Sequence, residues 1–74
     1  MNNGQAGRAK QYIKAELKRA DITYEELARR LTAEGMPETK ASIASKLSRG
    51  NFSATFFVAA LKAAGCQQIR LDEI

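Results

Sequence analysis

The chain has 74 residues, and alanine supplies 13 of its apolar positions, so we expect one domain with a small core. Lysine and arginine outnumber aspartate and glutamate 12 to 8, which gives a net charge of +4. Histidine is absent, cysteine occurs once and no long apolar run is found; we therefore expect a cytoplasmic protein that is no enzyme, holds no metal ion or cofactor and spans no membrane.

The first segments are predicted to be a tail and a basic helix. Residues 1–7 are polar and glycine-bearing, so we expect a disordered tail before a single domain at residues 8–74. Apolar residues then recur with the spacing of one helical face, at Ala9, Ile13, Leu17 and Ala20. Three lysines form a parallel stripe on another side: Lys10, Lys14 and Lys18. Such a stripe is ordinarily a solvated face, although a polyanion would be attracted to it.

A second helix is predicted from Tyr24 to about Glu34. Thr23 and Glu26 have the spacing of a capping box, in which each side chain bonds the other residue's backbone amide. Apolar residues on either side of the cap have the spacing of a hydrophobic staple. Glycine and proline directly after residue 34 are expected to end this helix.

A short third helix is predicted to begin at Glu38 or Thr39 and to end at Gly50. At 100° per residue, its apolar side holds Ile43, Ala44 and Leu47. The opposite side holds small hydroxyls and cations, namely Ser42, Ser45, Lys46 and Arg49. Between residues 39 and 50 there are three cations and no carboxylate.

The fourth predicted helix is apolar almost all round, and such a helix is normally buried. Ser53 is its expected cap, residues 55–64 form its body, and a glycine follows. Phe56, Ala59 and Ala63 make a second, narrower face, which we interpret as core or as the seam of a homodimer. Residues 67–74 fit a short extended segment, which could pair across a dimer axis, or the start of a fifth helix.

Three stretches resemble the lambda-repressor/Cro-like helix-turn-helix family. Residues 22–28 (ITYEELA) resemble its L-T-Q-E-E-L-A stretch, residues 44–50 (ASKLSRG) its I-S-x-x-E-x-G segment, and residues 57–65 (FVAALKAAG) its fourth-helix ending. The resemblance covers roughly residues 13–65. It implies an all-α, compact helix-turn-helix bundle of four or five helices, with the third helix in the DNA major groove.

The resemblance also implies a set of DNA contacts. Base edges or nearby phosphates would be met by Lys40, Ala41, Ser42 and Ser45, and the DNA backbone by Lys46 and Arg49. Tyr24 stands where the family has a glutamine that contacts phosphate, and Lys14 and Lys18 would add phosphate contacts from the first helix. The helical wheel alone places Lys40 on the buried side, whereas the resemblance places it outside.

Two departures from the family pattern stand out. Ser48 replaces the family's glutamate, so an ion pair with the first helix is missing. The stretch between Leu27 and Ser45 is six residues longer than usual, which predicts either a longer second helix or a looser turn. We therefore expect a divergent bacterial branch of the superfamily.

Together these patterns predict a small transcriptional regulator that binds double-stranded DNA. The alternative is a protein-interaction module that keeps the fold and docks a partner through the fourth helix, with its basic face merely solvated. RNA binding is less favoured, because no platform of exposed aromatic residues is evident.

Overall fold

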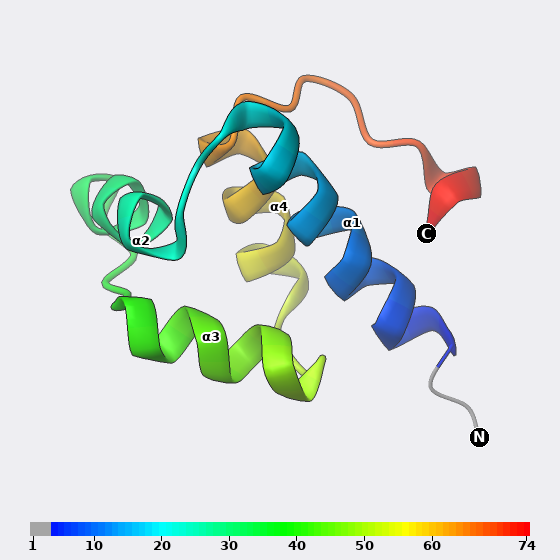
Figure 1. Cartoon of the computed structure of the whole chain (residues 1–74), viewed down its shortest axis with the longest axis horizontal. Helices are drawn as coiled ribbons and strands as arrows, with labels where there is room; N and C mark the ends of the chain where they lie inside the picture. The colour runs from blue at the N-terminus through cyan, green and yellow to red at the C-terminus, as the bar shows by residue number, and fades with distance from the viewer. Residues whose placement is uncertain (1–3) are drawn as a thin grey trace.

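The computed structural model describes residues 4–74, and its helices come in the order expected. They are α1 (Gly4–Ala20), α2 (Tyr24–Ala33), α3 (Lys40–Arg49), α4 (Ala54–Ala63) and a short 3-10 helix, η1 (Leu71–Glu73) (Figure 1). This confirms the compact, all-α, four-helix fold, and the described part of the chain contains no strand. The C-terminal segment is neither a strand nor a fifth α-helix. None of the described helices has the length and hydropathy needed to cross a membrane.

The first helix begins earlier than the sequence indicates. We expected a disordered tail at residues 1–7, but the backbone of α1 is helical from Gly4 onward. Residues 1–3 of that expected tail lie outside the described residues. Extending an existing helix fixes one residue for each new hydrogen bond, whereas starting one is costly, so α1 extends toward the N-terminus beyond Ala9, the first residue of the apolar face.

The core is small and draws on all four α-helices. Its largest fully buried side chains are Phe56, Ile13, Leu27, Leu31, Ile43, Leu47 and Leu61. The helices pack as the pairs α1–α4, α2–α3 and α2–α4. Because Phe56 is only 2% exposed, it belongs to the core and not to a homodimer seam, whereas Ala59 and Ala63 are half-buried.

Side-chain caps begin three of the helices as predicted. Thr23 accepts a hydrogen bond from the Glu26 amide at 3.1 Å, and Ser53 accepts one from the Phe56 amide at 3.0 Å. Glu26 does not complete a capping box, however, because its carboxylate bonds Arg29 and Arg30 instead. The complete capping box lies at the start of α3, where the sequence analysis did not predict one.

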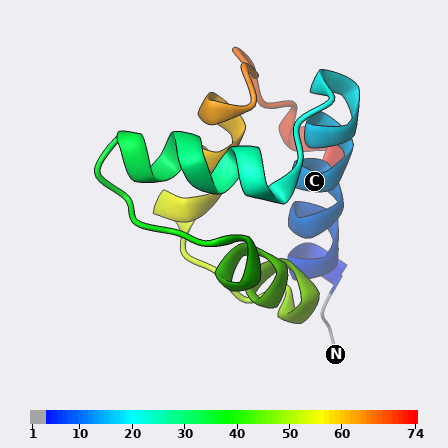
Figure 2. The ribbon, with the colours of Figure 1, turned by 60° about the vertical axis from the view of Figure 1, so that its left-hand side comes forward.

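The extra residues between the second and third helices form the connection and do not lengthen α2. The α2 helix ends at Ala33, where Gly35 takes a φ of 91° and the Met36 amide donates to the Leu31 carbonyl oxygen at 2.9 Å. The Thr32 hydroxyl bonds both backbone groups of Glu38, accepting from its amide at 3.1 Å and donating to its carbonyl at 3.2 Å. Hydrogen bonds therefore hold the long connection, visible in Figure 2, both at the end of α2 and at Glu38.

Candidate nucleic-acid interface

The outer face of α3 consists of small and basic side chains. Its exposed residues are Lys40, Ala41, Ser45, Ser48 and Arg49. Lys40 lies outside, as the resemblance implies and contrary to the helical wheel, because a first-turn residue has no preceding helical turn to cover it. Among the described residues, no carboxylate forms an ion pair with Lys40 or Arg49. This outer face therefore keeps its positive charge.

Ser42 does not belong to that outer face. It is half-buried, and its hydroxyl accepts from the Thr39 amide at 2.8 Å while donating to Glu38 Oε1 at 2.6 Å. The Thr39 hydroxyl accepts in return from the Ser42 amide at 3.0 Å. The expected exposure of Ser42 is thus corrected, because the hydroxyl closes the helix N-terminus instead of facing solvent.

Lys46 is also turned inward. Its ammonium group forms an ion pair with Glu38, whose side chain is only 6% exposed, and lies 4.8 Å from the centre of the Phe56 ring. Residues 39–50 contain no carboxylate, but Glu38 directly precedes this range in the sequence. The folded connection brings this carboxylate against α3 and neutralises one of the three cations there.

The contacts of Glu38 do not follow from the apolar periodicity, but the spacing of polar residues indicates them. Glu38, Ser42 and Lys46 are spaced four residues apart, which places them in one line along a helix and its preceding turn. An acid followed at this spacing by a hydroxyl and an amine indicates a hydrogen-bonded row. We had considered Glu38 only as a possible helix start.

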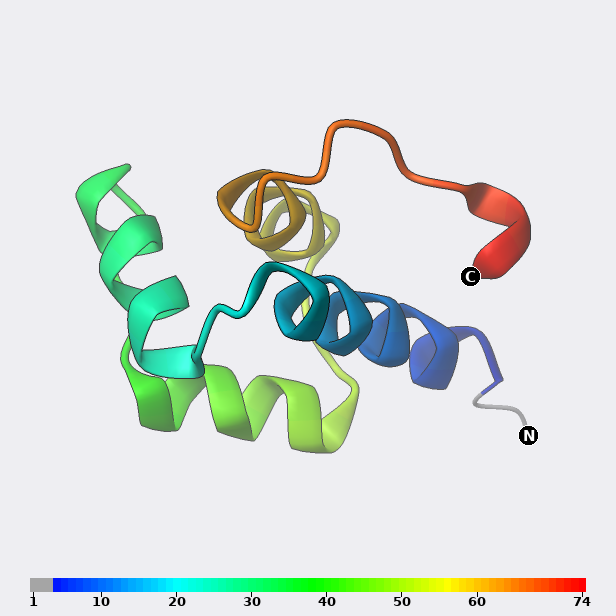
Figure 3. The same cartoon turned by 45° about the horizontal axis from the view of Figure 1, so that its top comes forward.

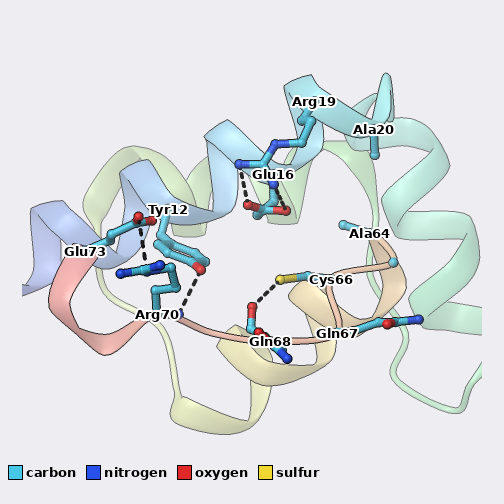
Figure 4. Close-up of a pocket in the computed structure, with 11 residues that line it drawn as sticks. Tyr12, Glu16, Arg19, Ala20, Ala64, Cys66, Gln67, Gln68, Arg70 and Glu73 are labelled. Carbon is cyan, nitrogen blue, oxygen red and sulfur yellow. Dashed lines mark hydrogen bonds and ion pairs between the residues drawn. The ribbon is translucent and has the colours of Figure 1, made fainter.

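The lysine stripe lies on the flank of α1 that faces away from the C-terminal segment. A hollow of about 620 Å³ lies between α1 and residues 64–73. Figure 4 shows three of the α1 side chains that line it, Tyr12, Glu16 and Arg19. Half a helical turn away, on the opposite flank, are Lys10, Lys14 and Lys18. In Figure 3 the C-terminal segment lies above α1, and α3 lies below it.

That hollow is bordered by polar contacts, one of which joins the C-terminal segment to α1. The Arg70 amide donates to the Tyr12 hydroxyl at 3.0 Å, and Arg19 forms an ion pair with the nearly buried carboxylate of Glu16 at 3.0 Å. Asp72, and secondarily Glu73, raise the pKa of the Arg70 guanidinium. The charges of Arg19 and Arg70 are therefore paired with carboxylates on this side of the molecule.

Pairing divides the cations of the described chain into two groups. Those in ion pairs are Arg19, Arg29, Arg30, Lys46 and Arg70. The pair with Glu26 raises the pKa of Arg29, chiefly through side-chain hydrogen bonds. Cations without an ion pair within residues 7–74 are Arg8, Lys10, Lys14, Lys18, Lys40, Arg49 and Lys62. All of these except Lys62 lie on α1 or α3.

Tyr24 lies at the first position of α2 and packs partly against the core. It is half-buried, so its ring serves the core while part of the side chain remains accessible. This placement allows the packing role and leaves room for the expected phosphate contact.

Comparison with known proteins gives one family match. A family model described as a domain of unknown function, DUF6471, matches residues 6–69. No curated protein and no solved structure matches the chain.

Proposed function

We propose that this chain, which belongs to the DUF6471 family, binds double-stranded DNA through the outer face of α3 as a small transcriptional regulator of the helix-turn-helix type. One observation carries the proposal: the exposed side of α3 holds Lys40, Ser45 and Arg49, and neither cation has an ion-pair partner among the described residues. Small side chains let a helix approach base edges closely, and unpaired cations attract phosphates.

The flank of α1 supports the same proposal. Lys14 and Lys18 are exposed and lack ion-pair partners within the described part of the chain. Like charges four residues apart repel each other slightly, and phosphates would turn that repulsion into attraction. In this proposal α3 reads the major groove, and α1 contributes phosphate contacts. A reducing cytoplasm is the proposed location, since Cys66 is a free thiol.

The test is a titration with random-sequence duplex DNA, followed by the backbone amide signals in NMR spectra at low salt. We expect shifts concentrated in α3, with smaller shifts on α1, and an affinity that falls steeply as salt is added. Absence of shifts at low salt would refute DNA binding. If the signals of α4 shift instead when another protein is added, the protein-interaction alternative is favoured.

Two single-charge variants separate a specific surface from general attraction. Arg49→Ala should weaken DNA binding several-fold and reduce the salt dependence by about one phosphate contact. Lys62→Ala removes an exposed cation from α4 that has no ion-pair partner among the described residues, and it should change affinity less than about twofold. Equal losses in the two variants would contradict recognition through α3. Ser45→Ala should mainly alter preference among DNA sequences.

A further inference from the structure

We propose that Glu38 is a positioning residue that sets the orientation of α3, and that Lys46 serves this contact instead of touching DNA. The inference rests on the proposed function, because the orientation matters for docking α3 on a duplex. The contact of Glu38 with Lys46 would explain how α3 presents a defined face although the connection before it is longer than in the resembled family.

The first support is the arrangement of the Glu38 carboxylate. Its side chain is 6% exposed, one oxygen accepts from the Ser42 hydroxyl at 2.6 Å, and the other is paired with the Lys46 ammonium. Both carboxylate oxygens therefore bind α3, one at its first turn and one about a turn further along. These contacts fix α3 relative to the backbone of Glu38, which the connection holds in place.

The second support is that the same row of residues reaches two other helices. Thr32 on α2 holds the backbone of Glu38 from both sides. At the far end, the Lys46 ammonium lies 4.8 Å from the ring centre of Phe56, which is buried on α4. The side chains thus connect α2, α3 and α4 through one buried charge.

The third support is energetic. A buried carboxylate that loses its partner is strongly unfavourable, so any tilt of α3 that separates Glu38 from Lys46 carries a penalty. A buried ion pair adds little net stability over apolar packing, yet it can select one arrangement among several. The Glu38 carboxylate therefore depends on its partner, and the charge of the half-buried Lys46 is already matched.

The inference makes a prediction opposite in sign to simple electrostatics. Removing a carboxylate beside a DNA-binding face should strengthen binding if charge alone matters. If Glu38 positions α3, Glu38→Gln should instead weaken duplex binding by about threefold or more, because the outer face is no longer held in register. Glu25→Gln is the matched control: Glu25 is exposed on α2 without an ion pair among the described residues, and its loss should raise affinity slightly.

Lys46→Met tests the other partner and keeps an apolar stem beside Phe56. We expect it to weaken DNA binding, and we expect the double variant with Glu38→Gln to bind no more weakly than the worse single variant. If Lys46 contacted phosphate directly, the two losses would multiply. Multiplied losses would overturn the inference.

Residual dipolar couplings of the α3 amides, measured without DNA, separate failure of this inference from failure of the proposed function. In Glu38→Gln and in Lys46→Met, the couplings of α3 should change relative to those of α1 and α4. If wild-type protein binds no DNA but these couplings change, the proposed function falls and the positioning role stands. Unchanged couplings, or tighter binding by Glu38→Gln as by Glu25→Gln, would overturn the positioning role. Should Glu38→Gln fail to fold, Lys46→Met alone gives the same decision.

Discussion

Lys46 and Arg49 show how far residues of equal charge can differ within one helix. Both lie near the end of α3, yet the Lys46 ammonium is paired with a buried carboxylate while Arg49 remains exposed. The difference arises from position along the helix, because the Glu38 carboxylate lies beside the first turns of α3 and Arg49 lies about 4.5 Å further along the axis than Lys46. Net charge by itself therefore overstates how much positive charge α3 offers to a partner.

Glu26 provides a residue-scale prediction of pH dependence. Hydrogen bonds from Arg29 and then Arg30 lower its pKa from the ordinary 4.5 to about 2. A carboxyl group with a lowered pKa in the folded state stabilises the fold above its ordinary pKa, and this contribution is lost as pH falls. The melting temperature of wild type should therefore exceed that of Glu26→Gln near neutral pH, and the gap should close between about pH 4.5 and 2.

Thermal unfolding followed by circular dichroism at several pH values measures this gap. Glu25→Gln serves as the control, because no described cation pairs with Glu25, and its difference from wild type should stay nearly constant over the same range. A gap for Glu26→Gln that persists unchanged at pH 2 would contradict the role of the two arginines.

At the scale of elements, the helix ends determine how α2 meets α3. The α2 helix stops at Ala33 because Gly35 adopts a positive φ and its neighbours bond back to the last turn. Thr39 and Ser42 then begin α3 with a reciprocal cap. The angle between the helices therefore depends on a few backbone bonds in the connection, in addition to the packing of apolar side chains.

Two glycine-to-alanine substitutions should have opposite effects on stability. Gly35→Ala places a side chain where φ is 91°, and we expect a loss of about 1 kcal/mol even though nothing lies within 4 Å of the new Cβ. Gly7→Ala, inside α1 with equally open surroundings, should instead gain about 0.5–1 kcal/mol. Melting temperatures should fall and rise accordingly, by about 4–8 °C per kcal/mol. Changes of the same sign would show that backbone conformation is not what distinguishes the two sites.

At the scale of the whole molecule, stability depends on one small core. A domain of this size has an unfolding free energy of about 4–11 kcal/mol, so individual core residues matter greatly. Leu61 is 1% exposed, and Val58 on the same helix is 44% exposed. Comparing substitutions at these two positions shows how much of the unfolding free energy depends on the buried core.

Leu61→Ala should lower the unfolding free energy by about 2–5 kcal/mol, a large share of the stability of a domain of this size. Val58→Ala should cost less than about 0.5 kcal/mol, because its side chain keeps much of its contact with water. Urea unfolding of both variants tests the comparison. A large loss in Val58→Ala that appears only at high protein concentration would indicate that this exposed side chain is covered by a second copy.

Much of the fold could be predicted from local signals. The spacing of apolar residues, the caps Thr23 and Ser53, and the glycines after α2, α3 and α4 depend on neighbours close in sequence, so the four helices follow from the chain itself. The outward placement of Ser45 and Arg49 follows from the same periodicity. Local patterns do not indicate the helical start at Gly4, and for residues 67–74 they leave open a short extended segment or the start of a fifth helix.

The sequence by itself therefore determined four helices and a basic character, whereas only the tertiary structure decided which cations are available. Glu38 lies outside the third helix in sequence, yet in space its carboxylate reaches Ser42 and Lys46 and removes both from the outer face. The physical reason is that charge pairing depends on distances across the connection, and these depend on how α2, α3 and α4 pack together. Periodicity reports the face on which a residue lies, but not the partner that the fold brings to it.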